Sequence, residues 1–431
     1  MNVTMEMLRE LLVESGVDPA VAQAVRPGVP LLRQGVDSLE YPAFSLAVES
    51  RFGLAIDERS SLSLRTLDDF AAFINERQAG EATDDEAISG LEQARQVAPG
   101  RKYEVGPLRP GDGQGVAQLF STVYGDRYPV EDYYIPERIE QLNNEGKLLT
   151  VVARLESGVI AGQGAYYQSS PPNKALFENG QLLVAPEYRN TRMANRITLE
   201  MNRLSRSMSQ AQGFFGEAVC THLVTQKLID KQGYGECGLE LSLMPAGAYA
   251  KEGAGAQRVS CLLAARVDRD RRMSLHLPEC YRMEMELILG GFSLNRDIRF
   301  SSLDAPLADR TSLDSRTFDF AAVERVQVSA VGTDFPERAL EIDQHAKSRG
   351  LAVLQVFVNA GEPGAVFAVE ALRARGFILG GVIPLWFGPD GMMMQKLYVE
   401  PEFETINLLS DKSKALLARI RAEWNSVRAK A

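Results

Sequence analysis

The first residues that could support chemistry form the run Gly35-Val36-Asp37-Ser38-Leu39, which opens an amphipathic stretch ending at Phe52-Gly53. Asp37 is a favourable N-cap, and it would place Ser38 in the first helical turn with its hydroxyl exposed. A phosphodiester on that hydroxyl would meet the positive end of the helix and its unpaired N–H groups. The run therefore marks Ser38 as a candidate modification site, with a simple helix cap as the alternative.

A second group lies in residues 181–194, where a strand ends, Pro186 makes a turn and a helix starts near Arg192. Backbone N–H groups at such a helix start can cradle a phosphate. The alternative is a basic surface turn that leads into a helix.

Three residues near this turn could transfer protons. Glu178 is expected just before the strand, Glu217 at the end of the next strand and His222 at the start of the helix that follows. The unperturbed pKa of histidine suits proton transfer near neutrality, and a carboxylate can serve as a base. A solvated glutamate and a packed or capping histidine are the alternatives.

The elements that must position these residues change character along the chain. Residues 1–77 read as a helical unit, and 78–100 are small and acidic like a linker. From 101 onward strands at 148–155, 159–167 and 181–184 alternate with helices near 193–208 and 221–231. A break near 300–314 precedes further strands at 321–331, 351–358 and 391–399 and a helix at 367–375. The pattern predicts a multidomain protein, all-α first and then α/β (α+β) around a mixed sheet.

Composition excludes several classes of function. The 431 residues carry a formal charge of −10, which argues against nonspecific nucleic-acid binding. Four cysteines without a CxxC pair and only three histidines argue against a disulfide framework, a zinc site or any other metal site, and favour the cytoplasm. No apolar run is long enough for a membrane span, and the acidic N-terminus does not look like a signal peptide.

The segment Gly35–Ile74 resembles the acyl carrier protein family. The matching features are Asp-Ser-Leu at 37–39, Phe52-Gly53, Ile56-Asp57 and the run 66–70, Thr-Leu-Asp-Asp-Phe. The resemblance implies a four-helix carrier bundle over 1–77 with 4′-phosphopantetheine attached covalently to Ser38. Asp37 and Leu39 would then serve carrier recognition, and a phosphopantetheinyl transferase and an acyl-loading enzyme would be partners. Pro42 departs from the family, which usually has a polar residue there.

Residues 181–194 resemble motif A of the GNAT acyltransferase family, Val-x-Pro-x-x-Arg/Gln-x-x-Gly-x-Gly/Ala. The resemblance implies that the loop binds the pyrophosphate of coenzyme A and that N–H groups near Leu183 and Val184 hold a thioester carbonyl. The pantetheine- or coenzyme A-binding residues that it implies are Leu183, Val184, Arg189, Asn190, Thr191, Arg192, Met193 and Ala194. Arg192 stands where the family has glycine. Such a loop is compatible with a phosphopantetheine donor that lacks adenosine pyrophosphate, although the arginine could also contact phosphate itself.

The stretch from Glu217 to Gly233-Tyr234 looks like motif B of the same family. The alignment puts His222 at the family's Asn position and Ile229 at that of the tyrosine often proposed as general acid. It implies Glu178 or Glu217 as the base, with His222 as an alternative base or as a replacement for the missing acid.

Residues 301–431 look like a second, degenerate GNAT-like region, with a helix that ends at Gly376-Phe377 but no motif A loop before it. We expect no independent catalytic centre there. The expected domains are thus a carrier at 1–77, a linker at 78–100, a GNAT-like domain at 101–300 and the degenerate copy at 301–431.

These resemblances together predict a carrier–acyltransferase fusion. An acyl group would pass between the Ser38 thioester, or acyl-CoA, and a small amine or amino-acid acceptor, and the tether would raise the effective concentration of the thioester. One alternative is a non-catalytic protein that presents the carrier to partner synthases. Another is an acetyl-CoA-dependent N-acetyltransferase acting on a carrier-bound amine.

Overall fold

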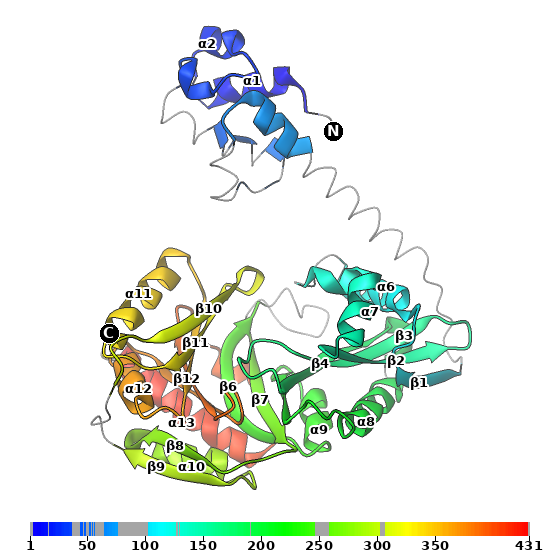
Figure 1. Ribbon diagram of the computed structural model, residues 1–431, viewed down its shortest axis with the longest axis vertical. Coiled ribbons are helices and arrows are strands. Elements are labelled where there is room, and N and C mark those ends of the chain that lie inside the picture. Colours follow the sequence, from blue (N-terminus) through cyan, green and yellow to red (C-terminus); the bar gives the residue numbers. More distant parts are fainter. Residues whose placement is uncertain are drawn as a thin grey trace. The chain divides into compact units, whose positions relative to one another are not determined.

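A computed structural model describes two units, Met1–Ala94 and Arg95–Ala431, each considered by itself (Figure 1). Among the described residues, no helix is both long and apolar enough to cross a membrane. The described residues are 3–15, 17–36, 44–45, 47–48, 51–52, 54, 56, 64–75, 102–125, 128, 130–189, 191–245, 258–301 and 307–429.

The first unit is helical. Helix α1 (Met5–Glu14) is capped by the Thr4 side chain, and α2 (Pro19–Ala24) by that of Asp18. A short 3-10 helix η1 (Leu31–Arg33) and a helix at 67–75 follow. The core of the unit includes Leu8, Leu12, Phe44, Phe70 and Ile74, all fully buried. The predicted helical character is confirmed for this segment, while Asp37, Ser38 and Leu39 lie outside the described residues.

The second unit is built on one twelve-stranded mixed sheet in the order β1-β2-β3-β4-β5-β7-β6-β13-β14-β12-β11-β10. Its first half contains β1 (Tyr103–Pro107), α6 (Asp112–Tyr124), η2 (Glu131–Tyr134), α7 (Pro136–Asn144), β2 (Leu148–Leu155), β3 (Ile160–Tyr167), β4 (Leu176–Val184), η3 (Pro186–Tyr188), α8 (Met193–Ser205), β5 (Gly213–Val219), α9 (Val224–Asp230), β6 (Gly235–Met244) and β7 (Val259–Val267).

The second half begins with β8 (Met273–Pro278), η5 (Glu279–Tyr281), α10 (Arg282–Leu289) and β9 (Arg296–Ser301), of which β8 and β9 form a separate parallel pair. It continues with β10 (Ser312–Phe318), η6 (Asp319–Ala321), β11 (Val323–Ala330), α11 (Phe335–Ser348), β12 (Val353–Asn359), α12 (Ala365–Arg373), β13 (Ile378–Ile383), β14 (Gly391–Leu397), η7 (Phe403–Thr405) and α13 (Asp411–Arg428).

The two half-sheets repeat one pairing scheme. Counted outward from the middle, β6-β7-β5-β4-β3 and β13-β14-β12-β11-β10 both pair antiparallel, antiparallel, parallel and antiparallel. The halves meet where Gly238 of β6 pairs with Gly381 of β13. In Figure 1, β6 and β7 run through the middle of the unit, with β1–β4 on one side and β10–β12 on the other.

The alternating strands and helices expected from the sequence are confirmed, and one boundary differs in a way that matters. The strand expected at 181–184 begins at Leu176, so Glu178 lies inside β4 and not before it. The early part of β4 pairs antiparallel with β3, and Glu178 is opposite Tyr167. Asn179 and Gly180 interrupt the apolar pattern, and therefore the local sequence did not indicate the full strand.

Helices cover both faces of the first half-sheet. α6 and α7 lie over one face of β2–β4, and α8 lies over the other (Figure 1). Apolar side chains from the inner faces of these helices fill the space against the sheet. Examples are Phe120 of α6, Ile139 of α7 and Ile197 of α8, all fully buried.

The junction between the half-sheets leaves no room for a side chain. A Cβ added at Gly238 would lie 2.8 Å from the Gly380 carbonyl oxygen and 3.1 Å from the Gly381 Cα, both backbone atoms. We expect Gly238→Ala to lower the free energy of unfolding by about 1–3 kcal/mol, the usual cost of overpacking. Urea unfolding followed by tryptophan fluorescence measures this for the second unit alone, since Trp386 and Trp424 both lie there.

The matched control is Gly106→Ala in β1, where an added Cβ would meet nothing within 4 Å. This variant should unfold at nearly the wild-type urea concentration. Equal midpoints for Gly238→Ala and Gly106→Ala would contradict the close approach at the junction.

Candidate functional site

The parallel strands β4 and β5 pair over only a short distance. Their register pairs are Leu176–Gly213, Phe177–Phe214 and Glu178–Phe215. Beyond them β4 bulges, with Gln181 at φ 54° and a register shift against β3. The edge of β4 after Glu178 therefore has no strand partner in β5, and its backbone groups can bind something else.

The predicted loop connects this unpaired edge to α8. Leu183 and Val184 end β4, the 3-10 turn η3 follows, and Arg189, Thr191 and Arg192 are exposed before the helix starts. The Thr191 hydroxyl accepts a hydrogen bond from the Met193 amide at 3.2 Å. The exposed guanidinium groups and the positive end of a 13-residue helix make this a place where an anion could bind.

Other residues of the predicted loop have different surroundings. The Met193 side chain is fully buried, so only its backbone can face a ligand, and Ala194 is partly buried in the first helical turn. Arg189 Nε donates to the Val184 carbonyl at 3.4 Å, which folds this side chain back over the turn. Asn190 lies outside the described residues.

Glu178 is partly exposed on β4 at the point where the two strands part. The Tyr167 hydroxyl donates a hydrogen bond to its carboxylate. Burial, and after it the negative charge of Glu217, raises the pKa of Glu178 to about 7. A carboxylate with a pKa near the working pH can both accept and release a proton.

Two tyrosines accompany this carboxylate. Burial and the Glu178 charge raise the pKa of Tyr167 well above its ordinary value, and burial raises that of Tyr133 to about 12. Both phenols therefore stay protonated near neutral pH, where a hydroxyl can donate one hydrogen bond and accept others through its oxygen. A Cβ at Gly180 would approach the Tyr167 hydroxyl to 2.9 Å, so the glycine leaves the space that this phenol occupies.

Glu217 lies on the same face of the sheet. It is two residues beyond Phe215, the register partner of Glu178, and side chains alternate along a strand. Arg325 Nη2 of β11 donates to Glu217 Oε1 at 3.2 Å and to Glu240 Oε1 at 2.9 Å. The structure thus places the two predicted carboxylates, Glu178 and Glu217, on one face of neighbouring strands, and it pairs Glu217 with a guanidinium from the second half.

The guanidinium has further partners on both sides. Arg325 Nε donates to Gln355 Oε1 at 2.7 Å, and Nη1 donates to Ser170 Oγ at 3.1 Å. Gln355 also donates to Glu240 at 2.8 Å. Because Arg325 of β11 contacts β5 and β6 although three strands, β13, β14 and β12, lie between β6 and β11 in the sheet order, the two half-sheets must bend toward each other.

Glu240 has the most enclosed carboxyl group of the three. Its side chain is fully buried, and Oε2 has no hydrogen-bond partner among the described residues. Burial, and after it the charge of Glu217, raises the pKa of Glu240 to about 8 despite the nearby Arg325. Arg325 thus contacts both Glu217 and Glu240, and the raised pKa of Glu240 favours the protonated form of this carboxyl group near neutral pH.

An aromatic stack fills the interior beside this network. Trp386 stacks on Phe357 with ring centroids 4.1 Å apart and meets Phe215 edge-on at 5.3 Å. Its Nε1 donates to Gln327 Oε1 at 2.7 Å. Trp386 is fully buried, as are Met393 and Met394, so these side chains belong to the core.

His222 lies in the loop between β5 and α9, beyond the end of the strand that carries Glu217. This loop contacts the C-terminal segment of the chain. The Asn407 side-chain amide donates a hydrogen bond to the Thr221 carbonyl oxygen at 3.2 Å. Ile229, at the position of the family's tyrosine, is buried in α9.

Sequence reasoning missed Tyr167, Glu240, Gln355 and Arg325. The signal for Tyr167 was the aromatic pair that ends β3, opposite a glutamate on the next strand. No local pattern could indicate Arg325, because its partners are 85 and 108 residues away along the chain.

The equivalent strands of the second half leave no gap. β11 and β12 pair over six successive positions, from Val323–Val353 to Val328–Val358. The start of α11 is covered by the chain's own segment: Thr311 donates from its amide and its hydroxyl to Asp334, both at 2.7 Å. A carboxylate already lies at this helix start, so among the described residues the start of α11 offers no equivalent place for a phosphate.

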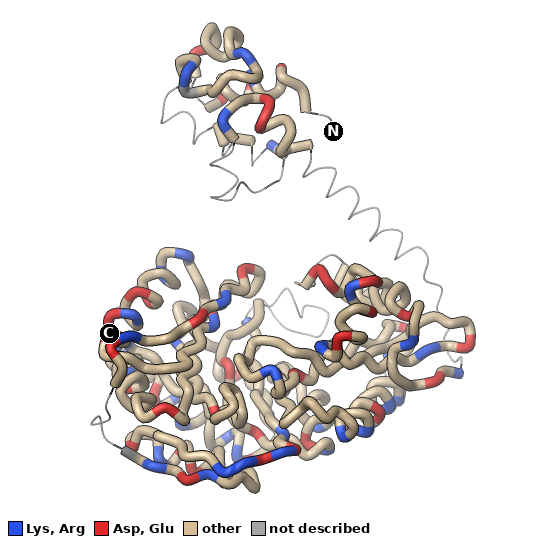
Figure 2. Tube along the Cα trace, viewed as in Figure 1, with Lys and Arg blue, Asp and Glu red and all other residues tan. Residues whose placement is uncertain are grey.

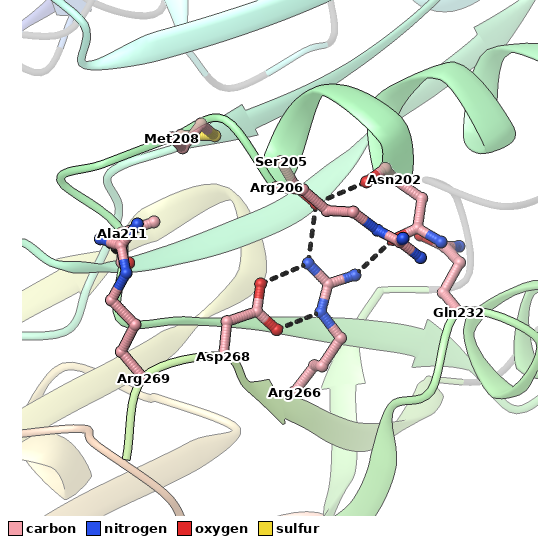
Figure 3. A pocket seen from close by; sticks show the side chains of 9 residues that line it. All are labelled: Asn202, Ser205, Arg206, Met208, Ala211, Gln232, Arg266, Asp268 and Arg269. Atoms are coloured by element: carbon pink, nitrogen blue, oxygen red, sulfur yellow. Dashed lines mark hydrogen bonds and ion pairs between the residues drawn. The ribbon is translucent and has the colours of Figure 1, made fainter. Parts of the chain in front are cut away.

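A cavity of about 330 Å³ lies on the other face of the sheet, toward α8 (Figure 3). Its central guanidinium, that of Arg266, is bound by Asp268 at 2.8 Å, Asn202 at 2.7 Å and Ser205 at 2.7 Å. It contacts the ring of Phe214, whose side chain points away from the Glu178 face. Because its polar groups already bind one another, this cavity is not the candidate functional site.

Among the described residues, no group of three or more His, Cys, Asp or Glu side chains is placed to hold a metal ion. Basic and acidic residues are intermingled along the chain of the second unit, as Figure 2 shows. Buried charge is concentrated in the network around Arg325 and in the pair of Arg296 with Asp390.

No family description and no curated protein matches the sequence. Solved structures similar to part of the chain include the ribosomal-protein-S5-alanine acetyltransferase from Vibrio fischeri, with 14% identity, 39% of this chain and 94% of that chain covered, and a TM-score of 0.31. A GNAT superfamily phosphinothricin acetyltransferase from Sinorhizobium meliloti in complex with AcCoA has 14% identity, covers 38% and 88%, and has a TM-score of 0.31. The ribosomal-protein-alanine N-acetyltransferase from Brucella melitensis has 15% identity, covers 38% and 99%, and has a TM-score of 0.31.

These neighbours are acetyltransferases by name, and the similarity extends over less than half of this chain. At such TM-scores they carry no argument about the activity of this protein. The chemistry of the site rests on its own geometry.

The raised pKa of Glu240 predicts a pH-dependent stability. The folded protein binds this proton more tightly than the unfolded chain, whose glutamate pKa is about 4.3. The resulting stabilisation is complete at low pH and is lost as the pH rises through about 8. We expect the free energy of unfolding of the wild type to fall between pH 5 and pH 9, with Glu240 contributing on the order of 2 kcal/mol.

Glu240→Gln should remove that contribution, because the neutral amide keeps an acceptor for Arg325 without a titrating proton. Urea unfolding at pH 5, 7 and 9, followed by tryptophan fluorescence, measures the slope. The exposed Glu156→Gln in the β2–β3 turn is the control and should keep the wild-type slope. An unchanged slope in Glu240→Gln would rule out a proton on this carboxyl group.

Proposed function

We propose that the second unit is an acyltransferase that moves an acyl group from a thioester to an amine, with Glu178 as the general base. One observation carries the proposal: a partly exposed carboxylate with a pKa near 7 lies where β4 parts from β5. The unpaired edge of β4 supplies backbone groups beside it. An acid–base group and an oxyanion-binding edge are the two elements that acyl transfer to an amine requires.

The reaction balances with the groups at hand. The acceptor amine attacks the thioester carbonyl, a C–N bond forms, and the carbonyl oxygen gains negative charge that backbone N–H groups of β4 can stabilise. Glu178 takes the proton that the amine loses. The C–S bond then breaks, the thiolate leaves and gains a proton, and Tyr167 is the nearest hydroxyl that could pass one from Glu178.

The donor would enter along the unpaired edge of β4, with its phosphate near the start of α8. Arg189 and Arg192 are exposed there, and the loop has an arginine where the GNAT motif has glycine. Such a loop suits the single phosphate of a pantetheine arm as well as coenzyme A. Residues Leu183 and Val184 would line the arm, and Thr191, Met193 and Ala194 would offer backbone groups. A phosphopantetheine or acyl-CoA thioester is therefore the proposed donor.

For the first unit we propose an acyl carrier function with 4′-phosphopantetheine on Ser38. The support is the Asp-Ser-Leu motif in a helical unit whose apolar core includes Phe44 and Phe70, with ring centroids 4.8 Å apart. A phosphopantetheinyl transferase would add the arm, and an acyl-loading enzyme would charge it. Small amines or amino acids would be the acceptors.

The second candidate function is a non-catalytic protein that presents the carrier. The buried Ile229 favours it, because no acid occupies that position of α9. A third is acetyl transfer from acetyl-CoA to a carrier-bound amine, and the exposed arginines before α8 favour that reading. Activity measurements with matched donors separate all three.

The carrier proposal predicts a covalent adduct. Treatment with coenzyme A and a phosphopantetheinyl transferase should add the mass of one phosphopantetheine, about 340 Da, to the wild type but not to Ser38→Ala. Intact-mass spectrometry measures it, and Ser45→Ala in the same stretch is the control that should still be modified. A wild type that stays unmodified would contradict the carrier proposal, but it would not affect the acyltransferase proposal for the second unit.

The base proposal predicts a loss of rate. With acyl-CoA or acyl-loaded holo-protein and a panel of amines, Glu178→Gln should lower kcat by about 10²- to 10⁴-fold, the usual contribution of a general base. The exposed Glu156→Gln should leave kcat unchanged. Full activity of Glu178→Gln would exclude Glu178 as the base, and a wild type inactive with every donor and amine would favour the presenter.

A further inference from the structure

We propose that Arg325, from the second half of the unit, is a positioning residue for the acyl-transfer site of the first half. By holding Glu217 in an ion pair, it leaves Glu178 as the carboxylate that exchanges the proton of the acceptor amine. This inference rests on the proposed function and adds to it the residue that selects the base. It also assigns a task to the second half, which has no gap between its own parallel strands.

The geometry fixes the guanidinium in one orientation. Its three nitrogens donate to four side chains, at 2.7 Å to Gln355, 3.1 Å to Ser170, 3.2 Å to Glu217 and 2.9 Å to Glu240. Arg325 is only 5% exposed. A planar fork with donors in several directions holds carboxylates in place, which the single ammonium of a lysine cannot do equally well.

The need for such a residue follows from the carboxylates themselves. Glu178 and Glu217 lie on one face of neighbouring strands, and Glu217 is 21% exposed in its side chain. Two carboxylates that interact strongly titrate as a pair, and either could then hold the shared proton. A guanidinium bound to Glu217 favours the charged form there and breaks this symmetry.

The direction of each effect on Glu178 is defined by its neighbours. Burial and then the Glu217 charge raise its pKa, while the hydrogen bond from Tyr167 and the charge of Arg325 lower it. The groups facing Glu178 from the surrounding elements are Tyr167 of β3, Ser169 of the β3–β4 loop, Tyr133 of η2, Glu217 of β5, Glu240 of β6 and Arg325 of β11. Of these only Arg325 is cationic, so its loss must raise the pKa of Glu178.

A matched control lies on the adjacent strand. Arg316 of β10 is the register partner of Arg325, and both guanidinium groups contact the ring of Phe318, at 5.1 Å and 5.6 Å. Arg316 is exposed. Replacing it removes an arginine of the same strand pair without touching the carboxylates.

The test compares Arg325→Met, Arg325→Lys, Glu217→Gln and Arg316→Met through the pH profile of kcat/KM. Arg325→Met should move the acidic limb up by about one pH unit or more, and Glu217→Gln should move it down by a similar amount, since a neighbouring charge shifts a pKa by about 1–3 units. Arg325→Lys should restore part of the profile, and Arg316→Met should match the wild type. The loss at pH 7 in Arg325→Met should appear in kcat, about tenfold, more than in KM.

A second readout needs no substrate. The carboxyl ¹³C shift of Glu178, assigned by its absence in Glu178→Gln, reports the titration of this group in full-length protein labelled at glutamate Cδ. Midpoints that move up in Arg325→Met and down in Glu217→Gln support the positioning role. If these shifts occur while the wild type acylates no amine, the proposed acyltransferase function fails, but the effect of Arg325 and Glu217 on the pKa of Glu178 is still established.

Two results would overturn the inference. One is a folded Arg325→Met protein, verified by its urea midpoint, with the wild-type midpoint of Glu178. The other applies if Arg325→Met does not fold. An unchanged titration midpoint of Glu178 in Glu217→Gln would then show that the Glu217 charge does not act on the base.

Discussion

The burial of one guanidinium group constrains the whole second unit. An arginine that is 5% exposed is costly unless charged and polar partners surround it, and removal of one partner leaves an uncompensated buried charge. The partners of Arg325 come from β5, β6, β12 and the loop after β3. A flat sheet would keep β11 away from β5 and β6, so the half-sheets have to bend around this residue.

The bend is possible because the junction is narrow. Gly238 and Gly381 bring the backbones of β6 and β13 into contact without side chains, and the stack of Phe215, Trp386 and Phe357 fills the inner space. The two halves then differ in the strands that matter most. β4 and β5 part after three register pairs, while β11 and β12 stay paired over six. One half therefore has an unpaired strand edge, and the other half supplies the buried Arg325.

Three glutamates of this interior illustrate how environment sets charge. Glu240 is fully buried and holds a proton near neutral pH, Glu217 pairs with Arg325, and Glu178 is partly exposed beside the Tyr167 hydroxyl with a pKa near 7. Carboxyl groups whose environments separate their pKa values can take different roles in one reaction. Identical residue types therefore become a structural acid, an anion and a candidate base.

The amino-acid sequence by itself determined the alternation of strands and helices, the helical first segment, the turn before α8 and Glu178 and Glu217 as candidates. These follow from local periodicity, turn residues and motif spacing, which are properties of short stretches. Only the tertiary structure decided that Glu178 lies within β4, that Tyr167 donates to it, and that Arg325 joins the halves. The reason is physical: burial and charge pairing depend on strands up to about a hundred residues apart, and local sequence carries no record of which strands will face each other.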